Sequence, residues 1–390
     1  MRCNGLIIIL LLRKVITMKN LRLEDHPYFT PFTDPQSGVT SFILTERIAP
    51  IQQAFYFTNY SVTDDGKYMW FYCSFPPSTN QTLGVVCLDA EAPFIRHYPQ
   101  AAFDSASPLI RPDGKGVYFC VRDEIHTIDL DGSTRLIAAL PKEFTRNRHV
   151  FSMATHLTIS ADGVYLLFDC QVGGSWAVGQ AEIATGEIEI FHTFARRYNH
   201  LQASPVDPEL FLLDQDWFYD VISGEHFNFD QRIWLMDTKG KRFEPLLPDH
   251  WYQHNSRDCH DFWAKDGHLC WVDYDHGAYE CDIISREITH VWKRPLCHAH
   301  TSTDRRYWVA DQDPYQWNDI TPCEVIFYDR QSNREINIYS ALPASGLPRL
   351  YHFDPHPAFT PDDRFIVCST TAGGNLDISL TPVENILSRI

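Results

Sequence analysis

Short apolar runs of strand-forming residues alternate with polar turns along most of this chain. Runs such as 68–73, 117–121, 165–168 and 365–368 are rich in aromatic and apolar side chains, and each follows an Asp-Gly-like turn. An Asp-Gly pair between two such runs is typical of a β-hairpin. No long segment has the 3.6-residue apolar period of an amphipathic helix, so the pattern predicts an all-β fold.

The hairpin turns recur at a nearly regular interval. Their aspartates stand at positions 65, 113, 162, 207, 266, 304 and 362, with spacings of 48, 49, 45, 59, 38 and 58 residues. Further strands follow each hairpin, as at 125–130 and 181–190. Repeats of about 40–50 residues with four strands are typical of a β-propeller. The seven turns therefore predict a seven-bladed β-propeller of four-stranded blades.

The two ends of the chain are expected to meet in one blade. The last repeat contains only three strands before the chain ends, whereas a strand at 38–45 has no blade of its own. We expect this N-terminal strand to become the outer strand of the last blade, which closes the ring and removes two open sheet edges. Without a linker or a low-complexity segment, residues 18–390 are interpreted as a single propeller domain.

The first 17 residues stand apart from this pattern. An apolar run at 6–12 lies between basic residues and is too short to span a bilayer. No Ala-x-Ala-like cleavage site follows it, and Met18 resembles an ordinary start. Residues 1–17 are therefore expected to be an extension or a misassigned start, and the protein to be cytoplasmic. If they belong to a signal, the protein is secreted or periplasmic instead.

The charge and the cysteine content limit the expected binding partners and the expected redox compartment. The net charge is −17 at pH 7 and no basic footprint extends over the domain, which argues against a nucleic-acid partner. No membrane partner is expected either, and the oligomeric state stays open. The 11 cysteines form no Cys-x-x-Cys pair, so we expect buried free thiols in a reduced compartment.

Histidines recur at one register of the repeat. Six residues before a turn aspartate stand Asn59, Ser107, His156, His260, His298 and His356, and His200 fits with a slip of one residue. The first strand of each propeller blade lines the central channel, so residues at this register are expected to meet at one mouth. Neutral imidazole is a common metal ligand and a proton acceptor near pH 7. The register predicts a metal or acid–base site, the alternative being histidines that only make hydrogen bonds.

The densest cluster surrounds His356. Asp354 and His356 project to the same side of an extended strand, and His352 continues this row. Together with His298 from the neighbouring blade, they form a mixed imidazole and carboxylate set that suits a divalent transition metal ion. No cysteine pair supports a Cys-type zinc site. His300 is an alternative ligand at a register that does not recur.

Several segments resemble the oligogalacturonate lyases, a family of seven-bladed propeller lyases. Segment 356–363 resembles that family's metal-binding His-Pro-x-Phe-Thr-Pro-Asp-Asp motif, and Cys297-His298 resembles its Cys-x-His segment without the middle residue. Segment 259–263 resembles its Thr-His-Glu-Phe-Trp segment, and 231–235 resembles its Ala-Arg-Met-Trp-Leu segment. With 34–40, which resembles the opening strand, the similarity extends from about residue 28 to the end.

The resemblance implies an activity and an assignment of roles. It implies a lyase of pectin degradation that cleaves short oligogalacturonate-like chains by β-elimination and leaves 4,5-unsaturated uronate products. The acidic oligosaccharide is then the partner. His260 corresponds to the proposed base and Arg232 to an active-site arginine. A divalent metal ion, Mn²⁺ in particular, is implied on His298 and His356.

The chain departs from the family at the metal-binding segment. The family pattern is Gln-x-x-His-x-His, and here Tyr351 stands at the glutamine position and Asp354 at the middle histidine position. Asp354 and His352 are therefore expected to complete the metal set. A carboxylate ligand lowers the positive charge of the site, so a related lyase that acts on a different uronate glycoside is an alternative.

Other polar residues are assigned to substrate binding. These are His200, His156, Tyr351 and Asn59. Other interpretations stay open for Arg232, which could pair with a strand carboxylate such as Asp230, and for Trp263, which could pack inside a blade rather than hold a sugar. A non-catalytic binding module and a hydrolase are the remaining alternatives. A hydrolase needs two carboxylates across the scissile bond, and Asp354 and Asp261 are the candidates.

Overall fold

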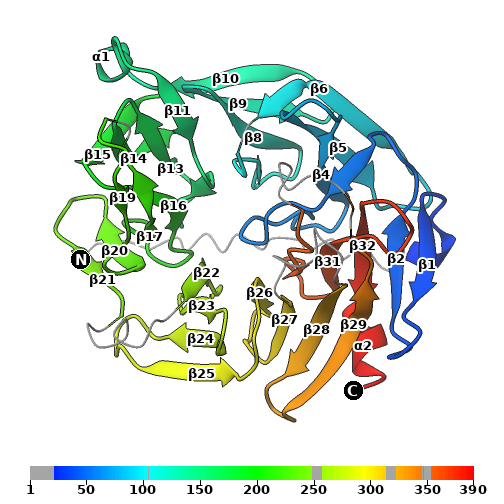
Figure 1. Cartoon of the computed structure of the whole chain (residues 1–390). Coiled ribbons are helices and arrows are strands. Elements are labelled where there is room, and N and C mark those ends of the chain that lie inside the picture. Colours follow the sequence, from blue (N-terminus) through cyan, green and yellow to red (C-terminus); the bar gives the residue numbers. More distant parts are fainter. Residues whose placement is uncertain are drawn as a thin grey trace, which may run out of the picture.

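Seven antiparallel β-sheets stand around a common axis in the computed structural model of this chain (Figure 1). The structure describes residues 22–103, 105–220, 222–247, 257–312, 322–344, 346 and 353–390. The protein is a seven-bladed β-propeller, as the repeat predicted. Residues 1–17 of the expected extension lie outside the described residues.

Blades 1 to 3 follow one another from the N-terminal side. Blade 1 contains β3 (Ile51–Gln53), β4 (Tyr68–Ser74), β5 (Gln81–Cys87) and β6 (Ile95–Phe103). Blade 2 contains β7 (Leu109–Ile110), β8 (Gly116–Val121), β9 (Glu124–Asp129) and β10 (Thr134–Ala139). Blade 3 contains β11 (Val150–Met153), β12 (Thr158–Ile159), β13 (Tyr165–Val172), β14 (Ser175–Glu182) and β15 (Ile188–Phe194). In blade 3, β11 and β12 are two pieces of the innermost strand, since they pair with opposite ends of β13.

Blades 4 to 6 have four strands each. Blade 4 contains β16 (Tyr198–Ala203), β17 (Leu210–Gln215), β20 (Ile233–Asp237) and β21 (Phe243–Pro245). Blade 5 contains β22 (Asp258–Trp263), β23 (Leu269–Asp273), β24 (Gly277–Cys281) and β25 (Ile288–Trp292). Blade 6 contains β26 (Ala299–Thr301), β27 (Tyr307–Asp311), β28 (Cys323–Asp329) and β29 (Arg334–Leu342). Between β17 and β20, a separate hairpin is formed by β18 (Phe218–Tyr219) and β19 (His226–Phe227).

Blade 7 closes the ring with strands from both ends of the chain. It contains β30 (Ala358–Phe359), β31 (Phe365–Thr370), β32 (Asp377–Pro382), β2 (Thr40–Leu44) and β1 (Phe29–Thr33). The pairing of β2 with β32 confirms the strand predicted at 38–45, and the Ser41 and Thr381 hydroxyls meet at 2.7 Å across it. The additional strand β1 was not predicted. It contains Pro31, which an outer edge strand tolerates because its outward N–H positions need no partner.

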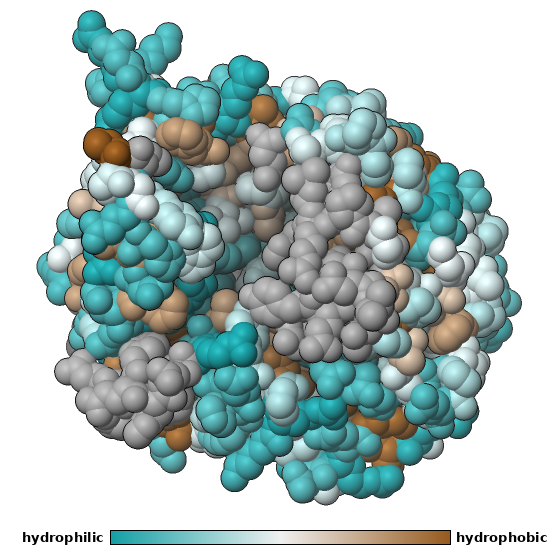
Figure 2. Space-filling model, in the orientation of Figure 1, coloured by the Kyte–Doolittle hydropathy of each residue, from teal (hydrophilic) through white to brown (hydrophobic). Residues whose placement is uncertain are grey.

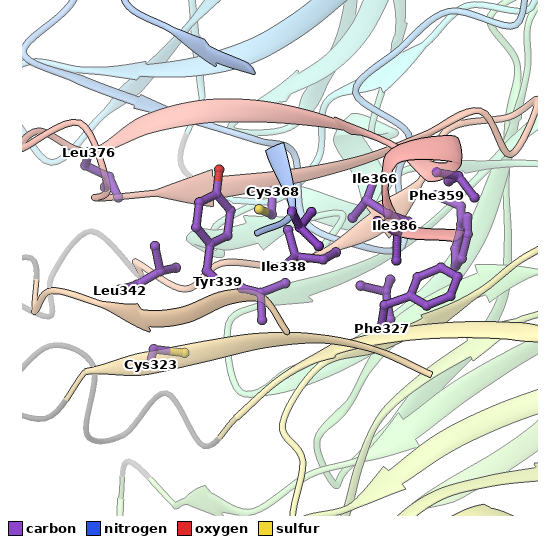
Figure 3. Close-up of a cluster of buried hydrophobic side chains, with 14 of the residues drawn as sticks. Cys323, Phe327, Ile338, Tyr339, Leu342, Phe359, Ile366, Cys368, Leu376 and Ile386 are labelled. Atoms are coloured by element: carbon purple, nitrogen blue, oxygen red, sulfur yellow. The ribbon is translucent and has the colours of Figure 1, made fainter. Parts of the chain in front are cut away.

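The blades pack face to face through apolar side chains. The middle strands are buried on both faces, as in β17, where all six residues are buried. The outer strands contain both buried and exposed positions, since they stand at the rim of the propeller and meet water. Figure 3 shows one such interface, where Phe327 and Ile338 of blade 6 face Phe359 and Ile366 of blade 7. The helical elements are short: η1 (Leu23–Asp25), α1 (Lys142–Thr145) and α2 (Val383–Leu387). Within the described ranges, no helix has the length and apolarity to cross a membrane.

The recurring turn is built by the same contacts in several blades. The Ser160 hydroxyl donates to Asp162, and the equivalent Ser or Thr hydroxyl donates to Asp65, Asp304 and Asp362. The next residue, such as Gly163, takes a positive φ, which glycine adopts without strain. These hydrogen bonds explain the repeat in the sequence, because each turn fixes where the first strand of its blade ends.

Candidate active site

A cavity of about 630 Å³ opens among the inner strands of the ring. Figure 2 shows this face of the molecule hollowed near its centre. His156, His200, His260 and His356 line the cavity, and all four stand in the predicted register or one residue from it. The His260 and His298 rings stack with centroids 3.9 Å apart, and the His298 and His356 centroids are 4.3 Å apart. Imidazoles from blades 5, 6 and 7 therefore meet at one place.

The backbone at these histidines is strained in the same way. His200, His260 and His356 have φ values of 54°, 52° and 46°, which residues other than glycine rarely adopt. In blades 4 and 5, His200 and His260 stand in β-bulges of the innermost strand. A bulge turns a side chain away from the regular strand alternation. A left-handed residue costs roughly 1–3 kcal/mol and is typical of functional sites.

The one-residue slip at His200 arises in the turn and not in the strand. Ser204 stands three residues before Asp207, whereas Ser160 stands two residues before Asp162. Counted from the serine, both His156 and His200 stand four residues earlier. The fourth repeat therefore keeps the register that the turn serine defines.

Two overlapping groups of side chains could hold a metal ion. In the first, the ligand atoms of His298, Asp354 and His356 lie within 4.8 Å of one another and all three residues are buried. The Asp354 Oδ2 and His356 Nε2 atoms are 3.9 Å apart. Two imidazoles and a carboxylate form a mixed nitrogen and oxygen donor set that fits a divalent first-row transition metal ion. The fourth expected ligand, His352, and the substrate candidate Tyr351 lie outside the described residues.

The second group combines His298 with His260 and the Cys297 thiol. In that group the His260 Nδ1–H already donates to the Cys297 carbonyl oxygen at 2.7 Å. A metal ion bound to Nδ1 of His260 would break this hydrogen bond. The first group keeps it, so it is the better candidate for the metal.

Asp311 orients two of the candidate ligands. The buried Asp311 carboxylate accepts from the His298 Nδ1–H at 3.0 Å and from the His298 backbone N–H at 2.7 Å. It also accepts from the His356 backbone N–H at 3.2 Å. Burial raises the pKa of Asp311 to about 7. Because Nδ1 of His298 carries the proton, its Nε2 atom is the one suited to a metal.

We expect Asp311→Asn to weaken metal binding about 10- to 100-fold, because the carboxylate that fixes the His298 tautomer is lost. Metal affinity is measured by titration of the metal-free variant with Mn²⁺. The matched control is Asp273→Asn, which changes the equivalent residue of blade 5. If both variants bind Mn²⁺ as tightly as the parent, Asp311 does not orient a ligand.

His260 has the tautomer and the protonation state of a base. Its Nδ1–H donates to the Cys297 carbonyl, so Nε2 carries the lone pair and accepts from the Tyr274 hydroxyl at 3.3 Å. Burial lowers the pKa of His260 to about 4. The imidazole is therefore neutral at pH 7 and can accept a proton at Nε2.

Arg232 lines the same cavity and forms two ion pairs. Its guanidinium contacts Asp214 and Asp216, each at 2.7 Å. The sequence-based alternative, a pair with a strand carboxylate, agrees with these contacts, although the partner named as an example, Asp230, pairs with Arg196 instead. Burial raises the pKa of Asp214 well above its ordinary value, and the nearby Asp261 carboxyl hydrogen-bonds to it. The arginine is thus held rigidly at the cavity wall by two carboxylates.

The other predicted residues fall into two groups. His156 and His200 line the cavity and hydrogen-bond to each other at 2.8 Å. Burial lowers the pKa of His200 well below its ordinary value. Asn59, in contrast, is not among the described residues that line this cavity, and its amide donates to the Pro108 carbonyl at 2.9 Å. The register therefore brings histidines of blades 3 to 7 together but leaves Asn59 bracing its neighbours.

Two alternatives are resolved by contacts outside the cavity. The Trp263 indole N–H donates to the Gln202 carbonyl at 3.0 Å, and the ring packs against a blade core, which favours packing over sugar binding. The His300 ring stacks on Phe262 and accepts from the Phe359 backbone N–H. His300 is thus engaged elsewhere and belongs to neither candidate metal group in the described residues.

A row of buried aspartates was missed by the sequence interpretation. Asp169, Asp214, Asp273 and Asp311 each stand seven residues after a turn aspartate, at or near the ends of the second strands of blades 3 to 6. All four are buried. The same counting that found the histidines could have found them, because a repeated buried carboxylate in a β-strand is unusual.

Comparisons with known proteins place the fold. No protein-family model matches the sequence, and no curated protein matches it. The solved structure of an oligogalacturonate lyase in complex with manganese aligns with a TM-score of 0.70 and 16% identity, over 91% of this chain and 96% of that chain. An oligogalacturonate lyase from Vibrio parahaemolyticus aligns with a TM-score of 0.70 and 18% identity, over the same shares. The predicted resemblance is confirmed for the fold: the chain has the propeller fold of these lyases.

Proposed function

We propose that this protein is a metal-dependent lyase that cleaves short uronate oligosaccharides by β-elimination and leaves a 4,5-unsaturated uronate end. One observation carries the proposal. His260, a neutral imidazole that lines the cavity, stacks on His298 of a buried candidate metal set, His298, Asp354 and His356, and His356 of that set lines the same cavity. The similarity in fold to two oligogalacturonate lyases supports the substrate class.

The proposed chemistry requires a base beside a neutralised carboxylate. A divalent ion bound to His298, Asp354 and His356 would neutralise the uronate carboxylate, which acidifies the adjacent C5–H bond. His260 takes the C5 proton at Nε2, while the Cys297 carbonyl holds Nδ1–H and stabilises the imidazolium that forms. The bond from C4 to the glycosidic oxygen then breaks, the C4–C5 double bond forms, and the leaving oxygen takes a proton from water to become a hydroxyl group.

Arg232 and the histidine pair are proposed to position the sugar. Arg232 is fixed by Asp214 and Asp216, so its guanidinium is held in one orientation at the cavity wall. We assign to it a uronate carboxylate or a ring hydroxyl. His156 and His200 share one hydrogen bond on the same cavity wall, and neutral imidazoles of this kind bind hydroxyl groups.

The carboxylate at Asp354 favours a second candidate, a related lyase with a different uronate preference. Asp354 adds a negative charge to the metal set, and Asp214, Asp216, Asp258 and Asp261 also line the cavity or its wall. These negative charges repel anionic groups, so a substrate with few carboxylates is expected to bind better than one with many. A screen of uronate oligomers distinguishes this candidate from one that prefers oligogalacturonate.

We also propose a cytoplasmic location. All ten cysteines in the described part of the chain are free, and nine of them are buried. Such thiols persist in a reduced compartment.

Ultraviolet absorbance tests the proposed activity directly. With Mn²⁺ present, incubation with oligogalacturonate and with other uronate oligomers is expected to raise the absorbance of the conjugated product. A heat-denatured sample is the control. If no uronate oligomer gives a rise, the lyase proposal is rejected, and a binding module or a hydrolase becomes the better interpretation.

A further inference from the structure

An aromatic hairpin stands at the edge of the cavity. The strands β18 and β19 form a two-stranded sheet of their own, inserted in blade 4 (Figure 1). Trp217, the residue before β18, lines the cavity although 45% of its surface is exposed. Tyr219 is 59% exposed. Large exposed aromatics beside a polar cavity are typical of a ligand-binding surface.

The aromatic residues of the hairpin divide into anchors and exposed rings. Phe218 stacks on Phe227 at 5.1 Å and meets Trp176 of blade 3 at 4.9 Å, so it fastens the hairpin to the propeller. Trp217 and Tyr219, on the alternate side, contact each other edge-to-face at 5.8 Å. Phe218 thus fastens the hairpin to blade 3, whereas the Trp217 ring contacts only Tyr219 and His226 among the described hairpin residues.

Trp217 contacts charged neighbours through its backbone and its ring. Its backbone N–H donates to Asp216 at 2.9 Å, and its carbonyl oxygen accepts from Arg197 at 3.4 Å. The Arg197 guanidinium also lies over the indole, 5.9 Å from a ring centroid. Asp216 is the carboxylate that binds Arg232 in the candidate active site. Asp216 therefore links the Trp217 backbone to Arg232 on the cavity wall.

We propose that Trp217 is the platform of an outer sugar subsite, which stacks the pyranose ring next to the uronate that is cleaved. This inference rests on the proposed function. A pyranose presents an apolar face of C–H groups and a polar rim of hydroxyl groups. The indole face that Arg197 does not cover matches the apolar face of the sugar, and the polar groups of Arg197 and Asp216 near Trp217 match the rim. The subsite would make substrate length matter: a chain with a further sugar gains contacts that a shorter chain lacks.

Binding to the His260→Ala background tests the subsite without turnover. With Mn²⁺ present, we expect Trp217→Ala to weaken tri-galacturonate binding about five- to tenfold and di-galacturonate binding by less than about twofold, measured by calorimetry. Trp217→Phe keeps a flat ring and is expected to retain most of the affinity. The matched control is Phe151→Ala, which removes a 58% exposed aromatic on β11 that does not line the cavity.

Tryptophan fluorescence gives a second measurement that needs only the conservative variant. Tri-galacturonate is expected to change the indole emission of the parent, and Trp217→Phe is expected to lose this change. Equal weakening of both saccharides, unchanged binding by Trp217→Ala or an unchanged emission response in Trp217→Phe overturns the subsite and leaves the lyase proposal standing. Failure of the parent to bind or cleave any uronate oligomer overturns the proposed function, and the subsite with it.

Discussion

Replacement of His260 by alanine is expected to lower kcat on a uronate oligomer by about two to four orders of magnitude. The neutral imidazole is the proton acceptor of the proposed reaction, with Nε2 facing the Tyr274 hydroxyl at 3.3 Å. In the described lining of the cavity, His156 and His200 are already bonded to each other, so neither replaces it easily. The rate is measured from the ultraviolet absorbance of the unsaturated product.

The same variant distinguishes the two candidate metal groups. If the ion is held by His298, Asp354 and His356, His260→Ala keeps its bound metal. If the ion is held by His260, Cys297 and His298, the variant loses the metal together with the activity. The matched control is His149→Ala, since His149 is an exposed histidine away from the cavity. Full activity in His260→Ala would rule out its role as the base.

The repeat made the fold predictable from the sequence. Blades 1, 3, 6 and 7 contain a Ser/Thr and Asp turn whose hydrogen bonds are local, so the residues that build it recur at fixed positions. The closing strand β2 was predictable because the last blade lacked a fourth strand. The outer strand β1 was not, since an edge strand that only continues a complete blade leaves no gap elsewhere in the pattern.

The candidate site was predictable only in part, for physical reasons. The register of the first strands brought His260, His298 and His356 together, because every first strand lines the same channel. The ion pairs of Arg232 depend on how β20 pairs with β17, which carries Asp214. The sequence separation of Arg232 and Asp214 does not reveal this pairing. Trp217 and the aromatic hairpin of β18 and β19 lie in an insertion outside the repeat. Its only signal was the spacing of 59 residues between the turns at 207 and 266.

Removal of the metal is expected to abolish the lyase activity, with a loss of at least about three orders of magnitude. The uronate carboxylate stays negative without the ion, so the C5 proton remains too weakly acidic for His260 to remove. A chelator is expected to produce this loss, and added Mn²⁺ is expected to restore the rate. His356→Ala is expected to produce the same loss without recovery, because it removes a ligand that both lines the cavity and approaches Asp354.

Elemental analysis separates loss of the ion from loss of the fold. His356→Ala is expected to contain no bound metal at an unchanged thermal unfolding temperature, whereas His300→Gln, the matched control, retains both metal and activity. His300 is suitable because its ring contacts Phe262 and the Phe359 backbone rather than the candidate ligands. If His300→Gln loses the metal and His356→Ala does not, His300 is a metal ligand and the candidate metal set is wrong. Activity that survives complete removal of the metal would require another group to neutralise the carboxylate, and Arg232, already fixed by Asp214 and Asp216, would be the residue to test.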